Sequence, residues 1–282
     1  MMGIRRQQLG TDANRRFCPI RFAHPARRAR ASALRKIAVS EPVSIPSLHD
    51  GESQRLAARM TEIAQAMSAC EGVDSFQTSG ILPDRFFALL ADLYAAYDAY
   101  IAHNLAASEL KIQCRFGCTR CCHQAVHGVY SFEIINLYRQ LRPLAEYGAI
   151  HDAFVEYADE FQATVVQISE ADDGDPADPA MRALEAFAAA AKPCPLLLGN
   201  NCRVYAHRPV PCRMYHSLTN PVFCTTPKGQ TFHLEIPPQT NEILWTLSDR
   251  LAFPFSTFLA QGLVTLAVRR QFRPWGAPLP AA

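Results

Sequence analysis

The stretch "CRFGCTRCCHQ" (residues 114–124) places four cysteines within nine positions and ends them with an adjacent pair. Its other residues are mostly charged or polar, which is not the composition of a core strand or helix. A second and more widely spaced set of cysteines follows between residues 194 and 224. Two such groups in one chain indicate a chemical site, and the fold has to bring them together.

Three explanations for the thiols compete. Free cysteine is often a small buried hydrophobe, but this polar setting does not favour that interpretation. Disulfides are typical of secreted proteins, whereas this chain shows no export signal, and adjacent cysteines bridge to each other only with strain. Thiolates also bind zinc, copper(I) and iron–sulfur clusters. The sequence therefore favours metal binding without identifying the metal.

Eight thiols are enough for two four-cysteine sites. The side chains of neighbouring residues diverge in either a strand or a helix, so Cys121 and Cys122 are better suited to two metals than to one. We therefore expect the first group to divide between two adjacent sites that the distant cysteines complete. The predicted metal ligands are Cys114, Cys118, Cys121, Cys122, Cys194, Cys202, Cys212 and Cys224.

For other residues near these cysteines the evidence of a role at the metal site is weaker. Histidine is an alternative metal ligand, but with eight thiols present we expect the nearby histidines to lie outside the coordination shell. Six nearby cations are candidates to offset the thiolate charge, and at least half of them are expected to be ordinary surface charges. The two remaining cysteines, Cys18 and Cys70, are interpreted as bystanders. The histidines are His123, His127, His207 and His216, and the cations are Lys111, Arg115, Arg120, Arg203, Arg208 and Arg213.

The rest of the chain is predicted to be mainly α, a helical domain with two irregular cysteine-rich segments and at most a few short strands. Ser131 is the expected N-cap of a helix that runs to residue 142. Apolar residues at helical spacing predict the other helices. Helices are expected at 52–70, 83–108, 131–142, 145–168, 180–192 and 240–270, an exposed loop at 169–179, and strands at 202–205 and 231–236.

Basic residues are concentrated at the N-terminus, where residues 1–36 contain ten Lys and Arg against a single acid, Asp12. The remaining 18 basic and 25 acidic residues give positions 37–282 a net charge of −7. The arginines are not interleaved with aromatic residues, which argues against nucleic-acid binding. We expect a disordered basic arm at 1–45, a single α-rich domain at 46–272 with its metal-binding core at 114–224, and a C-terminal tail at 273–282.

No stretch has the character of a membrane span. The most apolar region, residues 251–268, is interrupted by Pro254, Ser256, Thr257 and Gln261, whereas a spanning helix needs about 20 mostly apolar residues. The N-terminal arm has no continuous hydrophobic run and so is not a secretory signal peptide. These features together predict a cytoplasmic protein.

At the cysteine segments the sequence resembles the YkgJ-type cysteine-cluster family, a zinc- or iron-chelating domain. The family's CxxCxxCC-like first block continues as "CCHQ" with a downstream glutamate, here Glu133. Its second block is similar to "CPLL" (194–197) and "CRVYAHRPVPCRMY" (202–215), which Cys224 follows. Three residues separate Cys114 from Cys118, whereas the family has two.

One branch of this family resembles flagellin lysine N-methylases, which implies an iron–sulfur cluster used with S-adenosylmethionine. Cys114, Cys118 and Cys121 also share the C-x3-C-x2-C spacing of radical S-adenosylmethionine enzymes. Those enzymes are usually α/β barrels, and the alternating strands and helices of a barrel are not predicted here.

Three functions stay open from the sequence. The eight cysteines hold [4Fe-4S] clusters or zinc in a redox or methyl-transfer protein, acting on a protein substrate if it is an enzyme. Alternatively, zinc stabilises a module that binds a protein partner without catalysis. A metal buffer or chaperone is the third, and it needs exposed, exchangeable thiolates.

Overall fold

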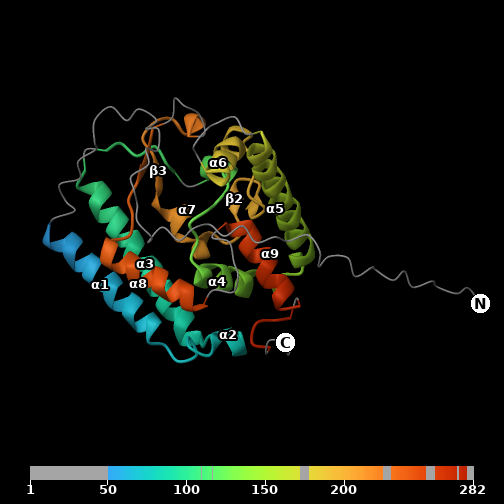
Figure 1. Cartoon of the computed structure of the whole chain (residues 1–282). Coiled ribbons are helices and arrows are strands. Elements are labelled where there is room, and N and C mark those ends of the chain that lie inside the picture. The colour runs from blue at the N-terminus through green and yellow to red at the C-terminus, as the bar shows by residue number, and fades with distance from the viewer. Residues whose placement is uncertain are drawn as a thin grey trace, which may run out of the picture.

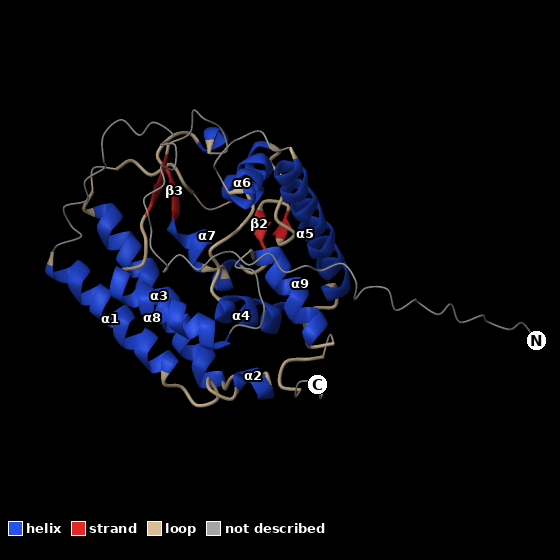
Figure 2. Cartoon of the chain, viewed as in Figure 1, coloured by secondary structure: helices blue, strands red, loops and turns tan. Residues whose placement is uncertain are grey.

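The computed structural model describes residues 50–108, 110–115, 117–171, 178–224, 230–251, 258–271 and 273–277. Within these ranges the chain is mainly helical, as predicted, and its strands form two short antiparallel pairs (Figure 2). The predicted basic arm, Cys18 and most of the predicted loop at 169–179 lie outside the described residues.

One side of the molecule is built on α1, which packs against both α3 and α8 (Figure 1). Apolar residues at helical spacing, such as Met60, Ile63 and Met67 of α1, are buried in this contact. A short helix, α2, joins α1 to α3. The bounds are α1 Gly51–Ser68, α2 Phe76–Ser79, α3 Asp84–Ala106 and α8 Pro238–Leu251.

The other side consists of α5 with α6 and α9 packed against it. Aromatic rings fill this contact: Phe161 of α5 lies 5.2 Å from Phe187 of α6 and 4.3 Å from Phe258, between ring centroids. Such ring pairs add to the free energy gained from burial alone. The bounds are α5 Tyr147–Glu170, α6 Pro179–Ala189 and α9 Leu259–Arg269.

Helix α4 (Ser131–Leu141) joins the two sides, because it contacts α8 on one and α9 on the other. All but two of its residues are buried. Its N-cap is Tyr130 rather than the predicted Ser131, whose backbone N–H bonds to Ser248 Oγ of α8 at 2.7 Å. The prediction was one residue off, because Glu133 inside α4 accepts the N–H of Tyr130 at 3.2 Å and Ser131 is already helical.

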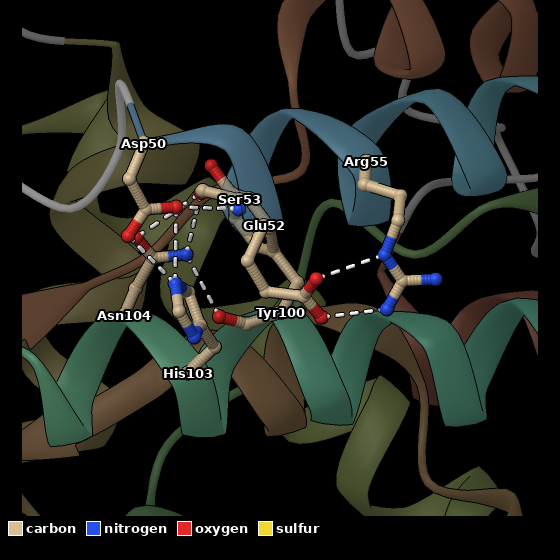
Figure 3. A network of polar contacts seen from close by, with 7 residues as sticks. All are labelled: Asp50, Glu52, Ser53, Arg55, Tyr100, His103 and Asn104. Atoms are coloured by element: carbon tan, nitrogen blue, oxygen red, sulfur yellow. Dashed lines mark hydrogen bonds and ion pairs between the residues drawn. The ribbon is translucent and has the colours of Figure 1, made fainter.

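A polar network ties the start of α1 to the end of α3 (Figure 3). The Asp50 carboxylate accepts the Ser53 backbone N–H at 2.7 Å, the usual N-cap contact. It also lies 2.8 Å from His103 Nε2 near the end of α3. Ser53 and Asn104 hydrogen-bond beside this pair. The network fixes the end of α3 from which the first cysteine segment leaves.

The cysteine-rich part of the chain consists of short elements. In Figure 1, α7 and β2 lie near the middle of the view, and β3 lies farther from α2. The bounds are η2 Arg120–His123, β1 Leu197–Leu198, β2 Asn201–Cys202, η3 Tyr205–His207, α7 Val210–Met214, β3 Tyr215–Ser217, η4 Pro221–Phe223 and β4 Thr231–His233.

Three predicted elements differ from the structure. The helix expected over 240–270 is two helices, which end at Leu251 and begin again at Leu259. The strand expected at 202–205 includes only Cys202, because the strand pair forms earlier, between 197–198 and 201–202. The strand expected at 231–236 ends at His233. Across the described ranges no helix combines the length and hydrophobicity that crossing a membrane requires.

Candidate metal centre

The first cysteine segment follows α3 in extended conformation and then turns at Gly117, whose φ of 80° favours glycine. The Cys118 backbone N–H closes this turn by bonding to the Arg115 carbonyl at 3.0 Å. The 3-10 helix η2 comes next and contains the adjacent pair Cys121 and Cys122. These local features place the cysteines on consecutive tight turns, an arrangement typical of metal-binding loops.

The second segment contains a β-hairpin and a short helix. Gly199, with a φ of 58°, makes the turn between β1 and β2, and β2 ends at Cys202. Pro209 precedes α7 and Pro211 lies in its first turn, where a missing N–H costs nothing. Helix α7 holds Cys212, and Cys224 directly follows η4.

Backbone hydrogen bonds join the two segments. The Cys194 N–H donates to the Cys122 carbonyl at 2.7 Å, and the Gln113 N–H donates to the Ser217 carbonyl at 2.8 Å. The Ser217 N–H in turn donates to Cys114 Sγ at 3.1 Å. The chain therefore brings both ends of the first cysteine segment against the second.

The thiols influence one another electrostatically, which shows that they share one neighbourhood. The pKa of Cys212 is raised by burial and by negative charge on Cys194, Cys121 and Cys202. The pKa of Cys224 is likewise raised by burial and by charge on Cys118 and Cys121. Cys121 contributes to both groups, as expected of a residue between two clusters, and it hydrogen-bonds to its neighbour Cys122.

Backbone N–H groups point at several sulfurs. The N–H of Leu196 bonds to Cys194 and that of Val204 bonds to Cys202, in each case two residues after the cysteine. Together with the Ser217 N–H on Cys114 they form a set of donors that favours thiolate over thiol. Burial works against them and raises the pKa of Cys194 to about 12. A bound metal ion would favour the thiolate over the thiol, because it binds the deprotonated form.

Of the six candidate cations, Arg208 lies where its charge acts on the thiols. The bond to Cys122 raises the pKa of Cys121 and burial raises that of Cys202, and the positive charge of Arg208 opposes both rises. The Nε of Arg208 is buried without a hydrogen-bond partner among the described residues. Arg203 instead pairs with Glu146 at 2.8 Å. Lys111, Arg115 and Arg120 are exposed.

Arg213, the sixth, anchors the second segment. It is only 4% exposed, and it donates to the carbonyls of Arg208 at 2.9 Å and Ala206 at 2.8 Å. It also pairs with Asp98 of α3 at 2.5 Å. Sequence reasoning assigned it to charge compensation and missed this role, although its fixed place after Cys212 in the R-P-x-x-C-R block was a signal.

Glu133 connects α4 to the same segment. This fully buried carboxylate accepts the N–H of Val210 at 2.8 Å and the hydroxyl of Tyr94 at 3.0 Å, and it caps α4 through the N–H of Tyr130. Val210 begins α7, so Glu133 holds the start of the helix that contains Cys212. Burial raises the pKa of Glu133 to about 7 against these donors.

The histidines take varied positions. His123 Nδ1 lies 2.9 Å from the Thr119 carbonyl, His127 is exposed, and burial lowers the pKa of both His207 and His216. None of the nine cysteines in the described part forms a disulfide. The bystander Cys70 lies at the end of α1, partly buried against the core.

The described side chains do not include three or more His, Cys, Asp or Glu residues grouped closely enough to hold a metal ion. What the structure does bring together is thiols from both segments, N–H donors aimed at three sulfurs, and the Arg208 guanidinium without an anionic partner. A thiophilic metal ion fits this set, because it would bind the sulfurs as thiolates, which accept these N–H hydrogen bonds more strongly than thiols do and attract the Arg208 charge.

Residues 113–234 match the model of the CxxCxxCC family, described as "Putative zinc- or iron-chelating domain". This segment is similar to the CxxCxxCC domain. The match contains every predicted ligand from Cys114 to Cys224 and covers about two fifths of the chain, which confirms the family resemblance seen in the sequence. No curated protein and no solved structure matches the chain.

Proposed function

We propose that the CxxCxxCC domain binds two zinc or iron centres through its eight cysteines. The observation that carries this proposal is the joining of the two cysteine segments by the hydrogen bond from the Cys194 N–H to the Cys122 carbonyl. It supports a shared site because it places cysteines that are 72 positions apart in sequence on neighbouring backbones.

The proposed division follows the electrostatic neighbourhoods. One centre takes Cys194, Cys202 and Cys212, and the other takes Cys114, Cys118 and Cys224. The adjacent pair supplies the fourth ligand of each, so Cys121 and Cys122 bind different metals. Four thiolates around a divalent ion carry a net charge of −2, which Arg208 and the backbone N–H donors offset.

The metals are proposed to organise these segments or to carry electrons. Cys194 lines a small pocket of about 10 Å³ among the described residues. A pocket of this size has room for about one water molecule. S-adenosylmethionine-dependent methyl transfer is the other activity that the family resemblance implies.

Anaerobic purification followed by metal and acid-labile sulfide analysis tests the proposal. We expect about two zinc ions per chain in a colourless protein, or iron with sulfide in a brown one. Cys121→Ser and Cys122→Ser should each lose metal, whereas Cys70→Ser, the matched control in the helical core, should keep it. Full metal content in both variants would rule out the division between two centres.

A further inference from the structure

The two cysteine segments differ in charge from the rest of the chain. Residues 110–132 and 190–234 contain eight Lys and Arg and no Asp or Glu, whereas the remainder of positions 37–282 has 10 basic and 25 acidic residues. Two four-thiolate centres with divalent ions would carry about −4 together, so these segments stay positive with metal bound. A surface of one sign attracts partners of the opposite sign.

Part of this positive charge is neutralised within the molecule, and part is exposed. Arg208 lies beside the thiols, as described above. Lys111, Arg115 and Arg120 are exposed, and no carboxylate of the described residues pairs with them. Three other cations pair with helix carboxylates: Lys192 with Glu160, Arg203 with Glu146 and Arg213 with Asp98.

Exposed apolar side chains gather on the same segments. Eight large hydrophobic residues in the described part of the chain are exposed, and four of them belong to residues 190–234, namely Leu198, Tyr205, Val222 and Phe223. Val222 and Phe223 are adjacent on η4, with exposed fractions of 44% and 39%. Single exposed hydrophobic residues are common, but an apolar pair beside arginine has the composition of a protein interface.

Hydrogen bonds hold η4 near two of the exposed cations. The Tyr215 hydroxyl of β3 donates to the carbonyl of Cys224, the residue that follows η4, at 3.1 Å. At the other end of β3, the Ser217 carbonyl accepts the Gln113 N–H at 2.8 Å. Strand β3 therefore contacts both the end of η4 and residues 110–115, which include two of the cations.

We propose that Lys111, Arg115, Val222 and Phe223 form a face that docks an acidic surface of another protein. The partner's carboxylates pair with the two cations, and an apolar side chain of the partner packs on the η4 pair. This inference goes beyond the proposed function, because it concerns a partner rather than a metal.

Charge and side-chain chemistry select this partner. The segments lack Asp and Glu, so an acidic surface meets no carboxylate of like charge on them. A protein is favoured over a nucleic acid because Val222 contributes an aliphatic side chain, which packs on apolar groups but offers no ring on which a base stacks.

Fluorescence anisotropy of the full-length protein, purified anaerobically, tests the proposal. The probe is a fluorescein-labelled peptide of alternating Glu and Leu. An all-Glu peptide and an oligothymidylate, each of the same charge as the probe, serve as comparison ligands. Metal content is measured on every sample, so a failure of the proposed function is distinguishable from a failure of docking.

Charge reversal should have the largest effect on binding of the probe. We expect Lys111→Glu/Arg115→Glu to weaken binding about tenfold or more, because like charges across an interface repel. Added salt should weaken binding to the wild-type protein by screening the same attraction. Arg59→Glu/Arg85→Glu is the matched control, since both arginines are exposed on α1 and α3, and it should bind the probe as wild type does.

The apolar half of the face is tested by Val222→Ser/Phe223→Ser. This variant should bind the Glu–Leu peptide severalfold more weakly and bind the all-Glu peptide with unchanged affinity, because only the first peptide has side chains that pack on η4. Lys111→Gln/Arg115→Gln repeats the charge test without placing new carboxylates near the thiols, and it should also weaken binding.

Three results would overturn the proposal. The first is a wild-type protein that does not bind the Glu–Leu peptide. The second is equal weakening by Lys111→Glu/Arg115→Glu and by the control, which would show that binding follows net charge rather than this face. The third is an oligothymidylate that binds as tightly as the peptide, which would assign the face to nucleic acid.

Discussion

The helical frame and the cysteine segments are stabilised in different ways. In the frame, formed by α1, α3, α4, α5, α8 and α9, long helices bury one apolar face each, and residues such as Phe86 and Phe132 are completely inaccessible. In the cysteine segments the elements are two to five residues long, and η2 has no buried residue. Burial of apolar surface therefore stabilises the first region more than the second, where it is carried by residues such as Leu196, Val204 and Val210.

Polar anchors from the frame compensate for part of this difference. Glu133 of α4 and Asp98 of α3 hold α7 through Val210 and Arg213. Individual hydrogen bonds contribute only about 0.5–1.5 kcal/mol each, so the segments are the region that gains most from bound metal. Metal should therefore control the local stability of the cysteine segments and leave the frame unaffected.

Metal removal should give the clearest difference between the two regions, in the protection of their amides from exchange. Because metal-binding energy is also folding energy, chelation should speed amide exchange in residues 114–124 and 194–224 by several orders of magnitude. Amides of α1 and α3 should keep their protection. Hydrogen exchange with mass spectrometry measures both, and equal loss of protection in the two regions would contradict the comparison.

A cavity created in the frame by substitution should lower the stability of the protein by the same amount with and without metal. Phe86 is fully buried against Phe132, with ring centroids 6.3 Å apart, so Phe86→Ala should lower the free energy of unfolding by about 3–5 kcal/mol. Urea denaturation should give the same loss with and without metal. A loss that depends on metal would show that the core and the cysteine segments are coupled.

Arg213→Lys tests the anchoring of the second segment. Lysine cannot reproduce the forked contacts with two carbonyls and Asp98, and we expect a loss of about 2 kcal/mol, with weaker metal retention. Arg250→Lys is the matched control in the frame, because this arginine bonds to Ser68 and to the largely exposed Asp74. The Arg250→Lys variant should lose less free energy of unfolding and should keep its metal.

The smallest expected effect is a pH dependence at the start of α1. The Ser53 N–H and the His103 pair lower the pKa of Asp50 below its ordinary value of 3.8. A depressed carboxyl pKa adds stability above pH 3.8, and that stability is lost as the pH falls through the folded-state pKa. Asp50→Asn should flatten this acid limb of the unfolding curve. An unchanged acid limb would show that the network around Asp50 contributes nothing to the pH dependence of stability.

The sequence predicted the frame better than the site. Helices over 52–70 and 83–108 followed from apolar residues at a 3.6-residue period, which tertiary contacts only reinforce. Strands of two or three residues have no measurable period, which is why the expected strand at 202–205 was misplaced. Helix α7 was missed for a similar reason, because five residues with two prolines around Val210 do not show helical periodicity.

For the site, the sequence indicated which residues could bind metal, but it did not indicate which residues contact one another in space. The concentration of cysteines predicted a metal centre, and the match over 113–234 agrees with a zinc- or iron-chelating domain. The N–H of Ser217 on Cys114 and the carboxylate of Glu133 on Val210 join residues that are far apart in the chain. Such contacts depend on how helices pack, and no local pattern encodes them.

The bond between Cys122 and Cys194 also has a consequence for synthesis. Helices α4, α5 and α6 lie between these residues, so the first four cysteines leave the ribosome well before their partners. At 5–20 residues per second, the 72 intervening positions take about 4–14 s. During that interval the adjacent thiols of Cys121 and Cys122 have no second segment to shield them. A cell that makes this protein under oxidising conditions should lose metal-competent chains at this step, before folding is complete.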